Sequence, residues 1–314
     1  MWLISHASGT IGRAAFRAAV DRGHGVRVLV HDPSQASLFA PAARAPGAES
    51  RGERPGETPV EVIVADVANT AEHKRAFEGV EAAILTAPLG SEFVPWHRAL
   101  AEAAETARVR HIVQLSGQGA DLNSPTRILR WLADAEAQAA KAGIHATVLR
   151  PSLYMQMLFK HVPEISSCGV IEAPFRHARW GLVDARDVAE VAIDRLERGA
   201  KPGVHELTGP QALDYAEIAK IVSRVIGRKI HYVDVCSPKA RGRLEAKRVS
   251  PRLTEALLEY WDFHATSGTT PRLTNEIEAI LGRPPRKLAE FVKDHKAEFG
   301  GGPCPSFFSL WNRK

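Results

Sequence analysis

Long apolar runs are absent from this sequence of 314 residues. None approaches the roughly 18–20 consecutive apolar residues that a membrane-spanning helix needs. A signal peptide is also lacking, because Met1 leads straight into a short apolar segment, with no basic region and no small-residue cleavage site. We therefore expect a cytoplasmic protein that does not associate with membranes.

Cysteine is scarce, since the sequence has only Cys168, Cys236 and Cys304, which lie far apart. No Cys-x-x-Cys pair is present, so neither a zinc ribbon nor a redox pair is indicated. The thirteen histidines form no His-Glu-x-x-His motif and no other recognisable ligand spacing. We expect no structural metal and no disulfide framework.

Strong charge clustering is missing too, although the net charge is +5 and the sequence pI is about 9.2. The basic residues are spread along the chain, apart from one local cluster at residues 238–248. No basic helix of the kind that binds nucleic acid is evident. The composition, 45% hydrophobic and 25% charged, is that of a globular protein, and we do not expect nucleic acid as a partner.

What the sequence does contain is a regular alternation of short apolar segments and helical patterns. The apolar segments are almost continuous in apolar character, which is typical of parallel strands buried on both faces. They cover residues 2–5, 26–30, 60–65, 83–86, 111–115 and 146–149. Between them, apolar side chains recur at helical spacing in residues 11–22, 71–77, 94–107 and 125–142. The alternation predicts an α/β fold with a doubly wound parallel sheet.

The sequence also predicts how the chain is divided. Residues 1–150 form the α/β domain, interrupted at 40–59 by a segment rich in Pro, Gly, Ala and charge that we expect to be a flexible loop. Residues 151–299 form a smaller, mainly helical C-terminal lobe, partly interleaved with the first domain. The tail, 300–314, has no periodicity, and its aromatic residues dock on a partner subunit or pack on their own chain. We expect a monomer or a homodimer.

The stretch "SHASGTIGR" follows the first predicted strand and opens the first predicted helix, which is the context of a dinucleotide-binding turn. Such a turn uses three glycines. One makes the tight turn, one lets the backbone approach the diphosphate, and one lets helix and strand pack closely. Gly9 and Gly12 hold the second and third places, but His6 stands at the first. The N–H groups at the start of the helix would then face the phosphates.

The histidine in the first glycine position leaves three interpretations open. A positive φ at a residue other than glycine costs roughly 1–2 kcal/mol, although histidine is found there more often than average. The imidazole would also occupy space beside the diphosphate. The site therefore binds a dinucleotide with altered geometry, or it is vestigial and holds no cofactor, or His6 is a functional group in a reworked pocket.

Polar residues after the second and third predicted strands support a nucleotide site. Asp32 lies twenty residues beyond Gly12, where an acid can bind the adenosine ribose hydroxyls and favour NAD. His31 could assist a 2′-phosphate, but only weakly unless it is protonated. Asp66 closes the third strand and could reach the adenine amino group. Each of these residues could instead be a polar strand end or the cap of a turn.

Several short motifs follow one another in order along residues 1–299. They are "SGTIGR", "VHDPS", "VADV", "LTAP", "LSGQGA", "HATVLRPSLYMQ", "VDARDVAEVA", "HELTGPQALDYAEIAKIVSRVIGR" and "GRPPRKLAEFVKDHKAEF". Together they resemble the NmrA-like group of atypical short-chain dehydrogenases/reductases. This resemblance implies a Rossmann domain, a small C-terminal substrate lobe, a cleft between them, and NADP or NAD as cofactor. It also implies either reduction of quinones, azo compounds or phenylpropanoids, or redox sensing without turnover.

The resemblance also implies a set of cofactor-binding positions. In order along the chain these are Gly9, Thr10, Ile11 and Gly12 at the diphosphate, Asp66 and Val67 at adenine, Thr86, Ala87 and Pro88 along the ribose, Ser116 and Gly117 at the nicotinamide, and Pro151 and Tyr154 closing the pocket. His31 stands where relatives often carry an arginine on the 2′-phosphate, and this departure weakens the case for NADP.

The active-site pair of typical short-chain dehydrogenases is missing. In that Tyr-x-x-x-Lys pair, the lysine lowers the tyrosine pKa so that the phenol exchanges a proton at neutral pH. Counted back from Glu136, its two positions fall near Ile128 and Leu132, which are apolar. A proton donor must therefore come from elsewhere. The candidates are Tyr154, Ser116, Asp121 and His6, of which we take Tyr154 and Ser116 as the catalytic pair to test.

Three functions follow from these observations. The leading hypothesis is an NAD(P)-binding oxidoreductase that reduces a small conjugated carbonyl, quinone or polycyclic aromatic substrate. The second is an enzyme that has lost the cofactor and uses the degenerate dinucleotide cleft for an isomerisation, cyclisation or ring opening. The third is a non-catalytic redox-sensing regulator that binds a dinucleotide and a protein partner.

Overall fold

The computed structural model describes residues 1–39, 58–66, 69–143, 146–199, 202–267 and 271–300. The predicted loop at 40–59 and the predicted tail at 300–314 lie almost wholly outside these ranges. The chain divides into two compact units. The sheet unit comprises Met1–Ser124, Leu129–Arg150 and Ala185–Glu206, and the C-terminal unit comprises Pro125–Ile128, Pro151–Asp184 and Leu207–Lys314.

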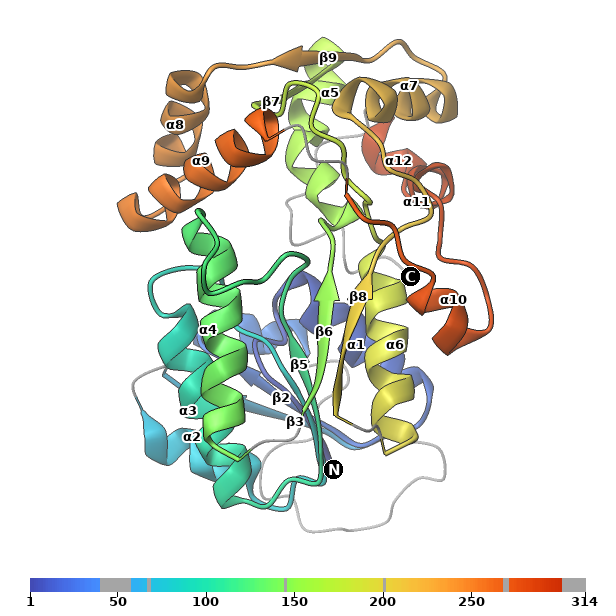
Figure 1. The fold of residues 1–314 in the computed structure, drawn as a ribbon. Coiled ribbons are helices and arrows are strands. Elements are labelled where there is room, and N and C mark those ends of the chain that lie inside the picture. The colour runs from blue at the N-terminus through green and yellow to red at the C-terminus, as the bar shows by residue number, and fades with distance from the viewer. Residues whose placement is uncertain (40–57, 67–68, 144–145, 200–201, 268–270, 301–314) are drawn as a thin grey trace. The chain divides into compact units, whose positions relative to one another are not determined.

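A seven-stranded sheet with the order β3-β2-β1-β4-β5-β6-β8 forms the centre of the sheet unit (Figure 1). Its strands are β1 (Trp2–Ile4), β2 (Val26–Val30), β3 (Val60–Val64), β4 (Ala82–Leu85), β5 (His111–Leu115), β6 (Thr147–Pro151) and β8 (Gly203–Leu207). The pairings from β3 through to β6 are all parallel. The predicted α/β fold with a doubly wound, Rossmann-type sheet is confirmed.

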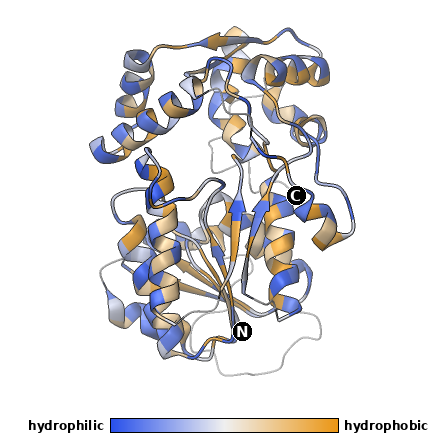
Figure 2. Cartoon of the chain, in the orientation of Figure 1, coloured by the Kyte–Doolittle hydropathy of each residue, from blue (hydrophilic) through white to orange (hydrophobic). Residues whose placement is uncertain are grey.

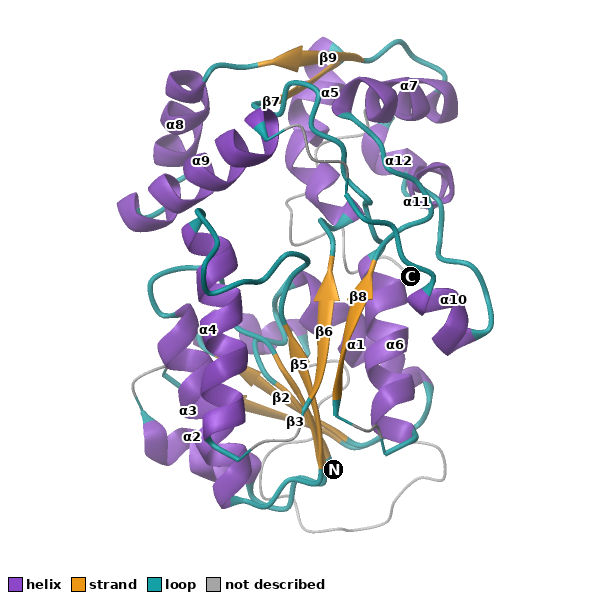
Figure 3. Ribbon diagram, viewed as in Figure 1, coloured by secondary structure: helices purple, strands orange, loops and turns teal. Residues whose placement is uncertain are grey.

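Two groups of helices cover the opposite faces of this sheet. One group is α1 (Thr10–Asp21) and α6 (Ala185–Glu197), which pack against each other. The other is α2 (Thr70–Phe77), α3 (Phe93–Thr106) and α4 (Arg127–Lys141) (Figure 3).

The core of the second face shows how the strand pattern is used. Leu3, Leu85 and Ile112 of the sheet share one core with Phe77 of α2 and Leu100 of α3. Figure 2 shows hydrophobic residues along the strands, as expected for a sheet covered on both faces.

The six predicted strands and four predicted helices of residues 1–150 are all present, with ends within two residues of the prediction. Helix α6 and strand β8 come from the predicted C-terminal lobe but belong to the sheet unit.

The C-terminal unit combines helices with a small parallel sheet of two strands, β7 (Val170–Ala173) and β9 (His231–Asp234). Its helices are α5 (Val162–Cys168), α7 (Tyr215–Ile226), α8 (Ser237–Ala246), α9 (Pro251–Thr266), α10 (Glu276–Leu281), α11 (Leu288–Asp294) and α12 (Lys296–Phe299). The described residues also form the 3-10 helices η1 (Pro33–Leu38) in the sheet unit and η3 (Met155–His161) in this unit.

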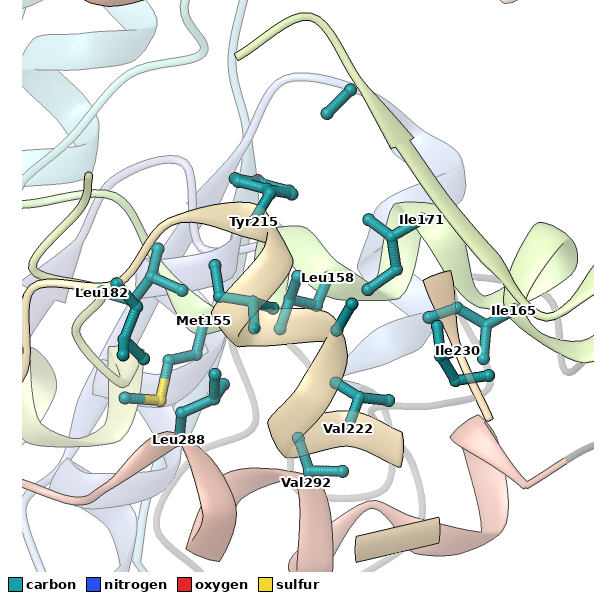
Figure 4. Packing of buried hydrophobic residues seen from close by; sticks show 14 of the residues in the cluster. Met155, Leu158, Ile165, Ile171, Leu182, Tyr215, Val222, Ile230, Leu288 and Val292 are labelled. Atoms are coloured by element: carbon teal, nitrogen blue, oxygen red, sulfur yellow. The ribbon is translucent and has the colours of Figure 1, made fainter. Parts of the chain in front are cut away.

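Local sequence and packing together specify this unit. Helix α7 begins at a capping box in which Asp214 and Glu217 bond each other's backbone N–H, and it ends at Gly227, whose φ is +80°. The helix buries Tyr215 and Val222 in an apolar core that also holds residues from η3, β7, α5 and α11 (Figure 4). No helix among the described residues has the length and apolar character needed to cross a membrane.

Candidate functional site

The carboxyl ends of β1 and β4 form the point where the order of strand connections reverses, and this is where open α/β sheets bind ligands. Ser5, which is fully buried, joins the two ends. Its hydroxyl donates to the Thr86 carbonyl (2.7 Å) and accepts from the Thr86 N–H (2.8 Å). No local pattern predicts this role for Ser5, although it is the first residue of the stretch "SHASGTIGR".

The turn from β1 to α1 places backbone amides at this point. Gly9 is the N-cap of α1, and the helical bonds begin with the Arg13 N–H donating to the Gly9 carbonyl (3.1 Å). The amides of Thr10, Ile11 and Gly12 therefore precede the hydrogen-bond ladder of the helix. Within the described residues no side chain caps this end, and the first turn carries no acid. Such a helix start favours an anion.

Gly12 has the packing role expected of the third motif glycine. A Cβ on Gly12 would lie 2.5 Å from the His6 carbonyl oxygen and 2.7 Å from Ala7 Cα. Neither backbone atom could move without displacing the turn, so a side chain at this position would separate β1 from α1.

Two side chains hold the turn in place. The Ser8 hydroxyl donates to Gln35 Oε1 of η1 (2.7 Å), and Arg13 Nε donates to the Ser8 carbonyl (2.8 Å). Arg13 is buried along the first turn of α1, where burial lowers the pKa of its guanidinium. The turn is therefore tied both to the segment after β2 and to its own helix.

His6 adopts the conformation that the first motif glycine would take, because its φ is +44°. Its ring lies against Gly9, since a Cβ on Gly9 would be 2.6 Å from His6 Cδ2 and 2.7 Å from Nε2. Nδ1 of His6 is buried and makes no hydrogen bond with any residue that the structure describes. The imidazole thus fills the side of Gly9 that the motif normally leaves open.

Two further histidines, His31 and His97, lie near His6. The ring centroid of His31 is 5.4 Å from that of His6 and 5.8 Å from that of Trp96. Burial, with smaller contributions from the charges of His31 and Arg13, lowers the pKa of His6 to about 4. Burial, followed by the charge of His6, lowers the pKa of His97 on α3 to about 3. Both His6 and His97 are therefore neutral at neutral pH.

The end of β2 carries the two residues predicted to meet the adenosine ribose. Asp32 is exposed and accepts a hydrogen bond from the Ser34 N–H (2.9 Å), so that it caps η1, and the bonds from Ser34 lower its pKa. Nδ1 of His31 is buried and bonds to none of the described residues. The capping role of Asp32 leaves its carboxylate at the surface.

The ends of β3 and β4 hold the predicted adenine and ribose positions. Asp66 is exposed, and its N–H donates to the Glu72 carboxylate of α2 (2.9 Å). Val67 lies outside the described residues. Thr86 and Ala87 are buried directly after β4, and Pro88 beside them is partly buried. These residues follow two strands whose carboxyl ends lie at the same edge of the sheet, with β2 and β1 between them.

At the end of β5, Ser116 belongs to a network of paired groups. Its hydroxyl donates to Oε1 of Glu136 on α4, and Arg150 of β6 binds the same carboxylate through Nε (2.9 Å) and Nη2 (2.6 Å). The hydrogen bonds that Arg150 donates to Glu136 raise the pKa of its guanidinium. Nothing in the local sequence predicts Glu136 and Arg150 as partners of Ser116.

Helix α4 carries apolar side chains at the two positions expected for the Tyr-x-x-x-Lys pair. Leu132 packs against Gly117, where a Cβ would lie 2.8 Å from Leu132 Cδ1. Ile128 is buried as an apolar side chain. Among the other candidate donors, Asp121 is exposed and accepts a hydrogen bond from the Asn123 N–H (2.8 Å).

The remaining predicted residues lie in the C-terminal unit. Pro151 ends β6, and Tyr154 forms an isolated bridge with Val183 before η3. Burial raises the pKa of the Tyr154 phenol, which therefore keeps its proton at neutral pH. In the same unit the ring of His264 on α9 lies 4.4 Å from that of Tyr260 on the same helix and 4.6 Å from that of Trp180.

The backbone of these residues can accommodate a dinucleotide, but one side chain obstructs it. The amides at the start of α1 supply donors for a diphosphate, and Gly12 permits the close approach of α1 to β1. The ring of His6, however, occupies the open side of Gly9. No group of three or more His, Cys, Asp or Glu side chains in the described ranges is arranged to hold a metal ion.

Comparison with known proteins gives relatives of almost the full length. The chain is 30% identical over 301 residues to an NAD(P)H azoreductase of Xenophilus azovorans, covering 96% of this chain and 99% of the relative. It is 29% identical over 301 residues to a (4-alkanoyl-5-oxo-2,5-dihydrofuran-3-yl)methyl phosphate reductase of Streptomyces griseus, covering 95% and 99%.

Solved structures share the fold. An NADPH-dependent quinone oxidoreductase of Escherichia coli, complexed with NADPH, superposes with a TM-score of 0.76 at 23% identity, covering 94% of this chain and 99% of that one. A Citrobacter triphenylmethane reductase complexed with NADP(H) gives 0.74 at 20% identity, with 94% and 99% covered. The model of the NmrA-like family matches residues 3–292, and the chain therefore belongs to this family, as its motifs predicted.

Proposed function

We propose that this chain is an NAD(P)-dependent oxidoreductase that reduces a small conjugated carbonyl, quinone or polycyclic aromatic substrate. The observation that carries the proposal is the start of α1, where three backbone amides precede the helical ladder at the reversal point of the sheet. The azo-dye, quinone and furanone phosphate reductases among the relatives support the same reaction class.

The residues of the sheet unit supply binding and orientation. The amides of Thr10, Ile11 and Gly12 would hold the diphosphate, and Asp32 and Asp66 would hold the adenosine. When bound, the reduced nicotinamide supplies hydride, and the protein's contribution is to orient it against the substrate.

Ser116 and Tyr154 are the side chains that we assign to the substrate. The Ser116 proton is directed to Glu136, so the hydroxyl oxygen is fixed by the network and keeps a lone pair for a substrate donor. Tyr154 keeps its proton because burial raises its pKa, which suits a hydrogen-bond donor and not a base. If Tyr154 delivers the proton, Tyr154→Phe lowers kcat more than Ser116→Ala does.

The proposal is tested by titrating NADH and NADPH, followed by their fluorescence, and by assaying oxidation of the bound form with quinone and azo acceptors. Thr10→Asp places a carboxylate on the amides at the start of α1, which suits the helix but excludes a diphosphate. We expect dinucleotide affinity to fall by roughly 100-fold or more.

Ser237→Asp is the matched control, because it makes a similar change at the first position of α8 in the other unit. Unchanged affinity in Thr10→Asp would contradict the proposed binding mode. Binding without turnover of any acceptor would favour the regulator, and turnover without dinucleotide would favour the cofactor-independent enzyme.

A further inference from the structure

The ring of His6 and a bound diphosphate compete for the same space. In dinucleotide sites, the second motif glycine lacks a side chain so that the diphosphate can approach the backbone. Here the direction in which a Cβ of Gly9 would point is filled by His6 Cδ2 and Nε2, at 2.6 and 2.7 Å from that Cβ position. The closed ring and a diphosphate on Gly9 therefore exclude each other.

We infer that His6 is a built-in cover on the dinucleotide site, which must swing away from Gly9 before the cofactor can bind. The inference rests on the proposed function and adds to it a residue of this chain that sets cofactor affinity. In this inference His6 opposes cofactor binding and is not a ligand of the phosphates.

Hydrogen bonding does not fix the ring of His6 over Gly9. Its Nδ1 is buried yet bonds to nothing in the described part of the chain, so no hydrogen bond holds the closed position. A buried polar atom without a partner is unfavourable, and leaving that position removes this penalty. The neighbouring ring of His31, tilted at 35° to that of His6, is a loose contact and not an interlocking stack.

The ring is also poorly suited to hold phosphate where it stands. It is neutral at neutral pH, because burial and the nearby positive groups oppose its protonation. Arg13, the nearest fixed cation in the turn, directs Nε to the Ser8 carbonyl. The diphosphate would therefore gain its main contacts from the amides of α1 and lose nothing when the ring departs.

The test compares the affinity of the full chain and of its His6→Gly variant for NADH and NADPH by isothermal titration. If the ring leaves Gly9 in about one molecule in ten, removing it lowers the dissociation constant about tenfold. Glycine accepts a φ of +44°, so the variant is expected to fold. His6→Asn, which also tolerates this backbone region, should give an intermediate gain.

Arg108→Gly is the matched control, because Arg108 is an exposed residue of the sheet unit with a φ of +55°. It relieves the same backbone strain without touching Gly9, and we expect it to leave both dissociation constants unchanged. A second readout is histidine-selective NMR of the unsubstituted chain, in which added dinucleotide should shift the ring resonances of His6.

The outcomes separate the inference from the proposed function. Equal or weaker binding by His6→Gly, with measurable binding by the unsubstituted chain, overturns the cover and leaves the oxidoreductase standing. Absence of dinucleotide binding in both chains overturns the proposed function, and the cover with it. Tighter binding in His6→Gly alone supports both.

Discussion

The two ends of the candidate site, at β5 and at β1, are built in opposite ways. At the end of β5, Ser116, Glu136 and Arg150 satisfy one another through hydrogen bonds and an ion pair. At the end of β1, His6 is held in a left-handed conformation with a buried nitrogen that bonds to none of the described residues. The first arrangement is suited to fix a side chain in position, and the second is suited to change when a ligand arrives.

Breaking the network of Ser116, Glu136 and Arg150 should have the largest effect on stability. Glu136→Ala leaves the guanidinium of Arg150 partly buried and without its carboxylate, because the two side chains are only 14% and 22% exposed. We expect a loss of about 2–3 kcal/mol in the free energy of unfolding, measured by urea denaturation. Glu102→Ala, which removes the exposed pair with Arg98 on α3, should cost about 0.3–0.5 kcal/mol. Equal losses in the two variants would show that the network is an ordinary surface pair.

Lowering the pH should first destabilise the region at the end of β1. The pKa values of His6 and His97 are lowered to about 4 and about 3, whereas an unfolded histidine titrates near 6.5. The unfolded chain therefore binds more protons as the pH falls through 6.5, and stability is lost from there down to the lowered pKa values. Each histidine contributes a slope of up to about 1.4 kcal/mol per pH unit.

His97→Phe separates that slope from general acid sensitivity. Both ring nitrogens of His97 are buried and bond to none of the described residues, so the substitution should cost little at pH 7 and flatten the decline below pH 6.5. Parallel pH curves for the unsubstituted chain and His97→Phe would contradict this interpretation.

The smallest expected effect is on the preference between NADPH and NADH, at the end of β2. The exposed carboxylate of Asp32 would repel a 2′-phosphate more than a ribose hydroxyl, so Asp32→Asn should improve NADPH binding relative to NADH by roughly fivefold. Asp21→Asn makes the same charge change at the far end of α1 and should leave the ratio unaltered. A ratio unchanged by Asp32→Asn would place the adenosine away from β2.

The sequence specified the backbone of this site better than its side chains. The strand pattern placed β1 to β6, and the spacing of Gly9 and Gly12 indicated a helix start facing a ligand. Both follow from local rules, namely apolar periodicity and the need for glycine where backbones approach. Helix α8 escaped prediction because it buries only Ala240 among its residues and so lacks an apolar stripe.

The partners of Ser5, Ser116 and His6 required the folded chain. Ser5 meets Thr86, and Ser116 meets Glu136, across long separations in sequence that no local pattern encodes. The sequence alone shows that His6 stands in place of the first motif glycine, and this position predicts a positive φ. The direction of its ring over Gly9 depends on the rotamer selected by the surrounding rings.

The most direct measurement is a crystal structure of the chain grown with saturating NADPH or NADH. We expect density for a diphosphate within hydrogen-bond distance of the amides of Thr10 to Gly12, with the imidazole of His6 turned away from Gly9. A nucleotide bound elsewhere, with the ring still resting on Gly9, would contradict the account.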